Sequence, residues 1–302
     1  MPGSRPVSSA PVSIDATCVD AMSFGGHRAR KRFGQHWLID AQVLDRIVAA
    51  AEIQPGERVL EVGPGRGALT ERLLASAAAA IVAVELDRDL VAGLRTRFGS
   101  DPRFVLIEGD GLTVPLTSDG GPVADKVVAN IPYNITGPLL ERLVGRLDRP
   151  APEPYQRLVL LVQQEVGERI RAIPGSGAYS ALSVRMQLLA RCRSVCAVPP
   201  RCFQPPPRVM SEVLVLEPLP AELLLPSVLA RTVEQLLKRC FAARRKMLRN
   251  SLAGLLPEEG IGDLAEQAGI DLRQRPQELA PERWVALASG LNQRKQTPNL
   301  HG

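Results

Sequence analysis

The chain has 302 residues, of which 45% are hydrophobic and 23% are charged, as in ordinary globular proteins, and this length can fill one large or two modest domains. No window holds the roughly 18 uninterrupted apolar residues that would suggest a membrane span. The net charge of +5 suits a nucleic-acid partner, provided that the Lys and Arg residues cluster.

Residues 1–24 differ from the rest of the chain in composition. They are rich in Ser, Pro and Ala, and they show no amphipathic period. Such a segment cannot bury enough apolar surface to offset the entropy of ordering. It also lacks the basic start and continuous apolar stretch of a signal peptide. We therefore expect a disordered tail over residues 1–24.

The cysteines bear on compartment and on metal binding. Because Cys18, Cys192, Cys196, Cys202 and Cys240 form no paired framework, the sequence favours a reducing cytoplasm over secretion. Three of them are close in sequence, which raises the alternative of a zinc site. They lack a nearby fourth ligand and the tight paired spacing of zinc motifs. We expect structural thiols and no metal.

From Val43 onward the hydrophobic pattern alternates between helical and strand periods. One helical face runs through Val43, Ile47 and Ala51. Strands are predicted at 58–61, 81–85, 104–107, 127–129 and 158–162, with helices at 68–75, 90–98 and 139–147. Short β-branched runs separated by helices indicate βαβ units and a parallel sheet that is covered on both faces.

The pattern changes toward the C-terminus. Helices are predicted at 165–172 and 181–190, and strands at 195–198 and 212–216 close the sheet, with an antiparallel arrangement as one option. Pro218 and Pro220 mark a boundary, and the chain beyond them is helical in pattern. The sequence therefore predicts an α/β protein with a Rossmann-like sheet domain over residues 25–218 and a small all-helical domain over residues 219–302.

A glycine-rich turn with the spacing Gly63-x-Gly65-x-Gly67 follows the first strand of the sheet. Glycine lets the backbone turn sharply and approach a ligand closely, although a plain strand–helix turn has the same signature. Glu85 ends the next strand, where a carboxylate can accept hydrogen bonds from both ribose hydroxyls. Asp110 follows the third strand and can accept from an adenine amine. Since no basic cluster follows the turn to neutralise a pyrophosphate, the set favours S-adenosylmethionine over a dinucleotide.

The tetrapeptide Asn130-Ile131-Pro132-Tyr133 follows the fourth strand. The side-chain oxygen of Asn130 and a carbonyl of Ile131 or Pro132 could accept the two hydrogens of a base amine, which would favour a nucleophilic geometry at its nitrogen. Tyr133 offers a flat face for stacking the base, worth about 1–3 kcal/mol. The absence of a cysteine here argues against a thiolate adduct on a base carbon. The alternative is a β-turn in which proline and asparagine serve geometry alone.

Phe203 precedes the stretch Pro205-Pro206-Pro207. It could supply a second stacking face for the base, or it could be a core residue that anchors the last strand. Both interpretations are open from the sequence.

Basic residues gather in two segments. The first is near the start of the ordered chain and includes Arg30, Lys31 and Arg32; the second runs from Lys238 to Arg249 and, on a helix, would form a basic face beside an apolar seam. A solvated helix face is the ordinary interpretation of such a run. Together the segments favour a two-sided clamp for RNA phosphates, in which the second segment contributes Arg244, Arg245, Lys246 and Arg249.

These motifs, in this order, resemble the KsgA/RsmA family of small-subunit rRNA adenine dimethyltransferases. The matching segments span about residues 27–252 and are 30–36, 61–65, 85–87, 130–133, 203–209 and 244–252. The resemblance implies an S-adenosylmethionine-dependent enzyme that dimethylates the N6 amines of two adjacent adenines in the 3′-terminal hairpin of 16S rRNA, in the 30S subunit.

The resemblance also implies which residues contact the cofactor: His36, Leu38, Gly63, Gly65, Glu85, Asp110 and Asn130. His36 stands where many relatives carry Asn, and Trp37 stands where Phe is usual. A backbone contact at position 36 would survive this change.

Three alternatives remain. One is a large-subunit rRNA adenine N6-methyltransferase of the macrolide-resistance type, in which Phe is common at the position of Tyr133. The second is a non-catalytic RNA-binding relative that acts in ribosome assembly, and the third is a small-molecule methyltransferase, which the basic C-terminal segment disfavours. A monomer is expected.

Overall fold

The computed structural model describes residues 35–117, 121, 123–256 and 258–296. The tail predicted over residues 1–24 lies outside the described residues, as do the predicted RNA contacts Arg30, Lys31 and Arg32.

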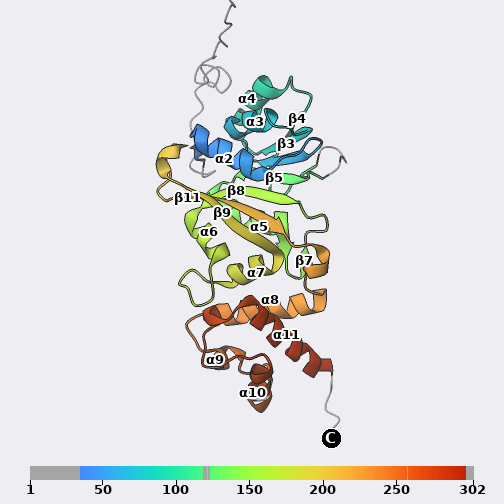
Figure 1. The fold of residues 1–302 in the computed structure, drawn as a ribbon, viewed down its shortest axis with the longest axis vertical. Helices are drawn as coiled ribbons and strands as arrows, with labels where there is room; N and C mark the ends of the chain where they lie inside the picture. The colour runs from blue at the N-terminus through green and yellow to red at the C-terminus, as the bar shows by residue number, and fades with distance from the viewer. Residues whose placement is uncertain (1–34, 118–120, 122, 257, 297–302) are drawn as a thin grey trace, which may run out of the picture.

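A seven-stranded sheet forms the centre of the molecule (Figure 1). Its spatial order is β4-β3-β2-β5-β8-β11-β9, with β2 (Arg58–Val62), β3 (Ala80–Glu85), β4 (Phe104–Glu108), β5 (Lys126–Asn130), β8 (Arg157–Gln163), β9 (Ala190–Val198) and β11 (Ser211–Pro218). Strands β2, β3, β4, β5 and β8 are parallel to one another, which confirms the predicted βαβ units. Strand β11 is antiparallel to both of its neighbours.

Helices cover both faces of this sheet. Along β8, Leu158 and Leu160 belong to one apolar cluster and Val159 and Leu161 to the other, as expected for a strand buried on both sides. Side chains of α2 and α3 complete the second cluster, and those of α5, α6 and α7 contribute to the first. The helices are α2 (Ala41–Ala51), α3 (Ala68–Leu74), α4 (Arg88–Phe98), α5 (Thr136–Val144), α6 (Gln164–Arg171) and α7 (Ala181–Leu189).

Two short ribbons were not predicted, because two-residue strands have no hydrophobic period. Strand β1 (Trp37–Leu38) pairs antiparallel with β10 (Phe203–Gln204), and β6 (Gly145–Arg146) pairs with β7 (Arg149–Pro150). The second ribbon also corrects the helix predicted at 139–147, which ends at Val144. Gly145 has φ +89° there, and a Cβ on it would lie 2.3 Å from the backbone nitrogen of Ala151.

The part of the chain after the sheet is helical, as predicted. Its described α-helices are α8 (Ser227–Phe241), α9 (Leu248–Leu252), α10 (Glu258–Gln267) and α11 (Pro281–Gln296), and it contains single turns of 3₁₀-helix at Ala221–Leu223 and Pro276–Glu278. Two further 3₁₀ turns lie earlier in the chain, at Tyr133–Ile135 and Pro200–Cys202. The α5–α7 side of the core continues into these helices. The fully buried ring of Trp284 lies 5.7 Å from that of Phe241, and the Tyr179 hydroxyl donates to the Leu279 carbonyl at 2.8 Å. The division into two domains at residue 218 stays a prediction.

The sequence analysis treated the basic segment from Lys238 to Arg249 as one helix, but the structure divides it between two. Helix α8 ends at Phe241, and a turn separates it from α9. The start of α9 is held by tertiary hydrogen bonds, since the Leu248 N–H donates to the Gln274 carbonyl at 2.8 Å and the Arg249 N–H to the Leu272 carbonyl at 3.0 Å. These contacts redirect the chain although its residues suit a helix.

Candidate active site

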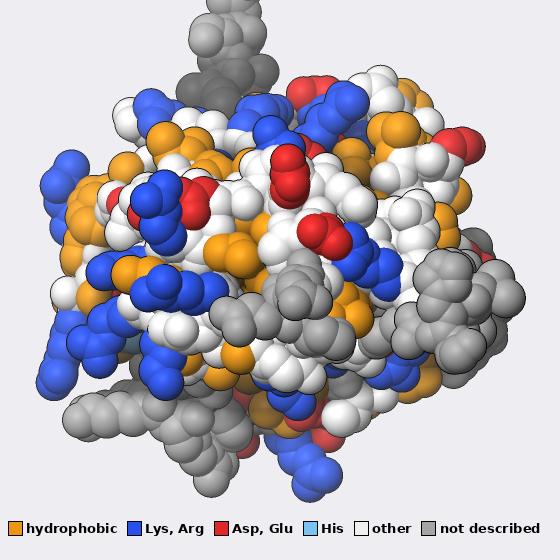
Figure 2. All heavy atoms as spheres, turned by 90° about the horizontal axis from the view of Figure 1, so that it is seen from below, with side chains coloured by type: hydrophobic (Ala, Val, Ile, Leu, Met, Phe, Trp, Pro, Cys, Tyr) orange, Lys and Arg blue, Asp and Glu red, His pale blue; other side chains and the backbone are white. Residues whose placement is uncertain are grey.

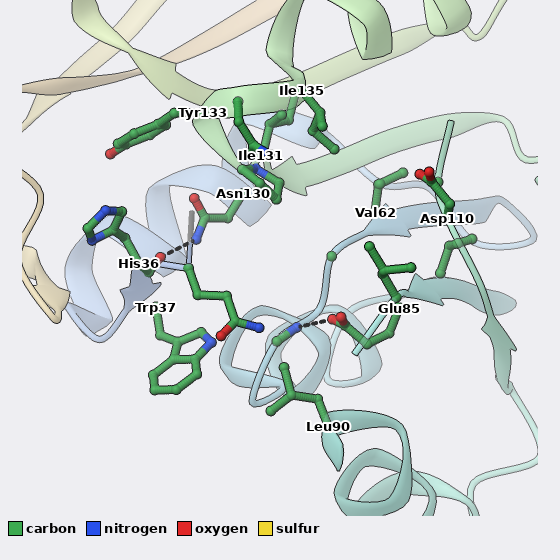
Figure 3. Close-up of a pocket in the computed structure, with 18 residues that line it drawn as sticks. His36, Trp37, Val62, Glu85, Leu90, Asp110, Asn130, Ile131, Tyr133 and Ile135 are labelled. Atoms are coloured by element: carbon green, nitrogen blue, oxygen red, sulfur yellow. Dashed lines mark hydrogen bonds between the residues drawn. The ribbon is translucent and has the colours of Figure 1, made fainter. Parts of the chain in front are cut away.

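The candidate site lies where the strand order reverses, between β2 and β5, at the carboxyl ends of the parallel strands. A cavity of about 270 Å³ opens there (Figure 3). Nine of the predicted site residues line it: His36, Gly63, Gly65, Glu85, Asp110, Asn130, Ile131, Pro132 and Tyr133. Residues far apart in sequence are thus brought together around one space.

The glycine-rich turn forms the floor of the cavity, and the lack of side chains at its glycines lets a ligand lie close to the backbone. Gly63 and Gly65 have φ values of +72° and +59°, which favour glycine. A Cβ on Gly65 would lie 2.9 Å from Cδ1 of Trp37, and Trp37 in turn packs under the Arg66 guanidinium, 4.0 Å from its ring centroid. The turn therefore needs glycine both for its conformation and for the close approach of Trp37.

Glu85 is fixed at the end of β3 with its carboxylate beside this turn. Its Oε2 accepts from the Gly65 N–H at 3.0 Å, drawn in Figure 3, and its Oε1 accepts from the Asp87 N–H at 2.9 Å. Burial raises the pKa of Glu85 to about 7, against the lowering effect of these hydrogen bonds. Each oxygen keeps a second lone pair, so the carboxylate can still accept from two hydroxyl groups of a ligand.

Two further carboxyl groups flank the site. Asp110 lines the cavity, and its Oδ1 accepts from the Leu112 N–H at 2.9 Å, which orients the side chain. Glu61, at the end of β2, is almost fully buried, and the Thr70 hydroxyl donates to its Oε2 at 2.7 Å. Burial raises the pKa of Glu61 to about 8, so it is largely protonated at neutral pH. Its hydrogen bond with Thr70 joins the end of β2 to α3.

Asn130 is oriented by the backbone of His36, near the start of the described residues. Its Nδ2 donates to the His36 carbonyl at 3.1 Å (Figure 3). Since the amide nitrogen is engaged in this bond, the Asn130 side-chain oxygen is the atom left to accept hydrogen bonds in the cavity. The tetrapeptide also packs on the glycine turn, because a Cβ on Gly63 would lie 3.7 Å from Cδ of Pro132.

Tyr133 is held on two sides. Its hydroxyl and the hydroxyl of Ser211 are 2.6 Å apart, and its ring stacks on that of His36, with centroids 5.6 Å apart and planes at 25°. Burial raises the pKa of the Tyr133 phenol, so it stays neutral. The His36 Nδ1 lies 2.8 Å from the Pro205 carbonyl, to which it donates. The tyrosine, the histidine and the proline stretch form one contact network.

Phe203 and Leu38 do not line this cavity. Both side chains are buried in the α2 side of the core, and they face each other across the β1–β10 ribbon. For Phe203 this placement supports the interpretation as a core anchor, because a ring that stacks on a base needs an open face. Leu38 lines an adjoining cavity of about 430 Å³, which shares Trp37 and Gly63 with the first.

The sequence analysis did not identify several apolar residues that line the cavity: Val62, Val84, Leu86, Leu90 and Ile135. Leu86 directly follows Glu85, and this position next to the predicted ribose acceptor is the one sequence signal that could have indicated it. Most of the others are buried side chains with no distinguishing pattern in the sequence.

The predicted C-terminal RNA contacts lie on the turn between α8 and α9 and at the start of α9. Arg245, Lys246 and Arg249 are exposed, and no carboxylate of the described residues pairs with them. The Arg244 Nη2 donates to the Gly177 carbonyl at 3.0 Å, so this arginine joins the turn to the α6–α7 loop.

The lining of the cavity fits a nucleoside ligand. The glycines provide a floor that a Cβ would fill, Glu85 can accept from ribose hydroxyls, and the apolar lining suits an adenine ring. Among the described residues, no three His, Cys, Asp or Glu side chains lie together as metal ligands would. In the same part of the chain, no helix has the length and apolar character to cross a membrane.

Comparisons with known proteins agree with this geometry. The family model described as ribosomal RNA adenine dimethylase matches residues 26–293. A Parasynechococcus marenigrum (strain WH8102) protein named ribosomal RNA small subunit methyltransferase A is 71% identical over 272 residues, 90% of this chain and 90% of that protein. A protein of the same name from Prochlorococcus marinus (strain MIT 9303) is 66% identical, over 90% of this chain and 97% of its own length.

Two solved structures share the fold over most of their length. A dimethyladenosine transferase from Plasmodium falciparum has a TM-score of 0.75 at 26% identity, covering 86% of this chain and 98% of its own. The 23S rRNA methyltransferase ErmE has a TM-score of 0.67 at 27% identity, covering 85% and 99%. This chain belongs to the ribosomal RNA adenine dimethylase family and is an S-adenosylmethionine-dependent methyltransferase.

Proposed function

We propose that the protein transfers methyl groups from S-adenosylmethionine to the N6 amines of two adjacent adenines in the 3′-terminal hairpin of 16S rRNA. The substrate would be the 30S subunit during its assembly, in the cytoplasm, and the enzyme would act as a monomer. The relatives at 66–71% identity are named for the small subunit, which supports 16S rRNA over 23S rRNA.

The observation that carries the proposal is the orientation of Asn130. With Nδ2 bound to the His36 carbonyl, its side-chain oxygen is available to accept a hydrogen from an adenine amine. The Pro132 carbonyl already accepts from the Ile135 N–H at 3.1 Å, which makes the Ile131 carbonyl the better candidate for the second acceptor. Two acceptors on one amine would draw its nitrogen lone pair out of conjugation with the ring.

The chain's own residues would act by position and not by covalent chemistry. S-Adenosylmethionine supplies an electrophilic methyl group when it is bound. Glu85 and Asp110 would hold the nucleoside end of the cofactor, and the glycine-rich turn would leave room for its amino-acid end. Neither the Asn130 side chain nor the Ile131 carbonyl can take up a proton at neutral pH, so their contribution is orientation of the amine and stabilisation of the charge that develops on it.

Exposed cations would guide the RNA. Figure 2 views the molecule from the end that carries the C-terminal helices, and Lys and Arg side chains gather along one side of this face, with hydrophobic groups between them. Arg245, Lys246 and Arg249 are exposed on the α8–α9 turn. Mobile counterions would leave RNA phosphates on contact with these side chains, which makes binding dependent on salt.

The experiment is methyl transfer to purified subunits. The protein is incubated with labelled S-adenosylmethionine and 30S subunits that lack these methyl groups, and modified bases are mapped by reverse-transcription stops. We expect stops at two adjacent adenines in the 3′-terminal hairpin. Labelling of 23S rRNA alone would show that the protein is a large-subunit rRNA methyltransferase instead. No labelling of either RNA would contradict the proposal.

A further inference from the structure

The imidazole of His36 lies at the end of the cavity where a base amine would react. In Figure 3, His36 and Tyr133 are near Asn130, whereas Glu85 and Asp110 are at the opposite end. His36 therefore belongs to the acceptor part of the site by position, and its side chain differs from the Asn that many family members carry.

Two contacts hold this imidazole in place. Its ring stacks on Tyr133, and its Nδ1 donates to the Pro205 carbonyl at 2.8 Å. The contact with Asn130 is of a different kind, because it uses the His36 backbone carbonyl. A substitution at position 36 can therefore remove the ring and leave the orientation of Asn130 intact.

The stacked pair leaves no space for a base between its rings. Two stacked planes are separated by about 3.5 Å, so a base held between two rings requires them to be about 7 Å apart. The His36 and Tyr133 centroids are 5.6 Å apart. A base that stacks on this face of Tyr133 must displace the imidazole.

We propose that His36 is a positioning residue that caps the base-stacking face of Tyr133 in the RNA-free enzyme and gives way to the acceptor adenine. This inference rests on the proposed function, in which Tyr133 stacks on that base. The cap is held by one exposed hydrogen bond and one ring contact, both of which an incoming base can replace. The imidazole covers this face of the Tyr133 ring in the absence of RNA. Because the base must displace it, the cap lowers the apparent affinity for RNA.

The test is a comparison of His36→Asn with the unchanged protein. Loss of the two contacts corresponds to an increase of about 5- to 100-fold in kcat/KM for undermethylated 30S subunits. His36→Ala also keeps the backbone carbonyl and should change kcat/KM in the same direction. Ile39→Ala is the control, since Ile39 is 55% exposed and does not line this cavity. It should leave kcat/KM unchanged.

A binding measurement separates this role from a merely structural one. A 16S hairpin with 2-aminopurine in place of an acceptor adenine reports extrusion of the base by its fluorescence. We expect His36→Asn to extrude the base at a lower protein concentration, with the affinity for S-adenosylmethionine measured alongside by calorimetry. If His36→Asn has a kcat/KM equal to or lower than that of the unchanged protein and extrudes the base at the same protein concentration, His36 does not cap Tyr133. If the unchanged protein methylates no 16S adenine, the proposed substrate is wrong instead, and the two failures are distinguishable.

Discussion

The pKa of Glu85 makes the affinity for S-adenosylmethionine dependent on pH. Burial raises this pKa to about 7 in the free protein. Two ribose hydroxyls that donate to the carboxyl group would favour its ionised form, so binding should release a proton when the pH is below 7. The free protein then binds more protons than the complex, and the affinity should rise with pH up to about 7 and level off above it.

The size of the effect follows from this pKa. One pH unit below the pKa, ionising the carboxyl group costs about 1.4 kcal/mol, so the dissociation constant at pH 6 should be about tenfold higher than its plateau at pH 8. Isothermal titration calorimetry from pH 5.5 to 8.5, in buffers of different ionisation enthalpy, measures both the affinity and the proton release.

A matched pair of variants assigns the effect. Glu85→Gln should bind about 10- to 100-fold more weakly at pH 8 and lose the pH dependence, because a charged acceptor is replaced by a neutral amide. Glu108→Gln is the control, since Glu108 lies opposite Glu85 in the β3–β4 register but does not line the cavity. A flat affinity profile in the unchanged protein, or a slope that persists in Glu85→Gln, would refute the reasoning.

Three further predictions concern catalysis, folding and RNA binding. Asn130→Ala should lower the single-turnover rate by about 10²- to 10³-fold while RNA binding in a filter assay persists; retained turnover would remove Asn130 from the mechanism. Gly67→Ala should cost about 1–3 kcal/mol in urea unfolding, because φ is +81° and its Cβ would lie 2.3 Å from a phenylalanine ring, whereas Gly137→Ala, with nothing within 4 Å, should be neutral or stabilising. The double variant Lys246→Gln/Arg249→Gln should reduce the slope of log affinity for RNA against log salt by about 1–2, and an unchanged slope would exclude these side chains as phosphate contacts.

The sheet was predictable because its signals are local. Short β-branched runs ending in Glu61, Glu85 and Asn130 specify buried parallel strands, and the carboxyl ends of such strands meet at one edge of a sheet. Nine of the predicted cofactor and acceptor residues therefore converge on one cavity, whereas Leu38 and Phe203 lie outside it. The family is also identifiable from these motifs and is confirmed by the comparisons.

One wrong expectation and one open question of the sequence analysis share a physical cause. Lys238 to Arg249 has a helical pattern, but backbone hydrogen bonds to Leu272 and Gln274 interrupt it, and no local signal encodes those bonds. Phe203 was equally consistent with stacking on a base and with burial until its pairing with Leu38 placed it in the core.

By itself, the sequence determined the parallel sheet, the glycine-rich turn and the identity of the groups at the strand ends. The tertiary structure alone decided how these groups are oriented and charged: the backbone of His36 turns the Asn130 amide, and the burial of Glu85 brings its pKa near 7. Motifs are local in sequence, whereas hydrogen-bond direction and desolvation depend on neighbours that only the folded chain brings together.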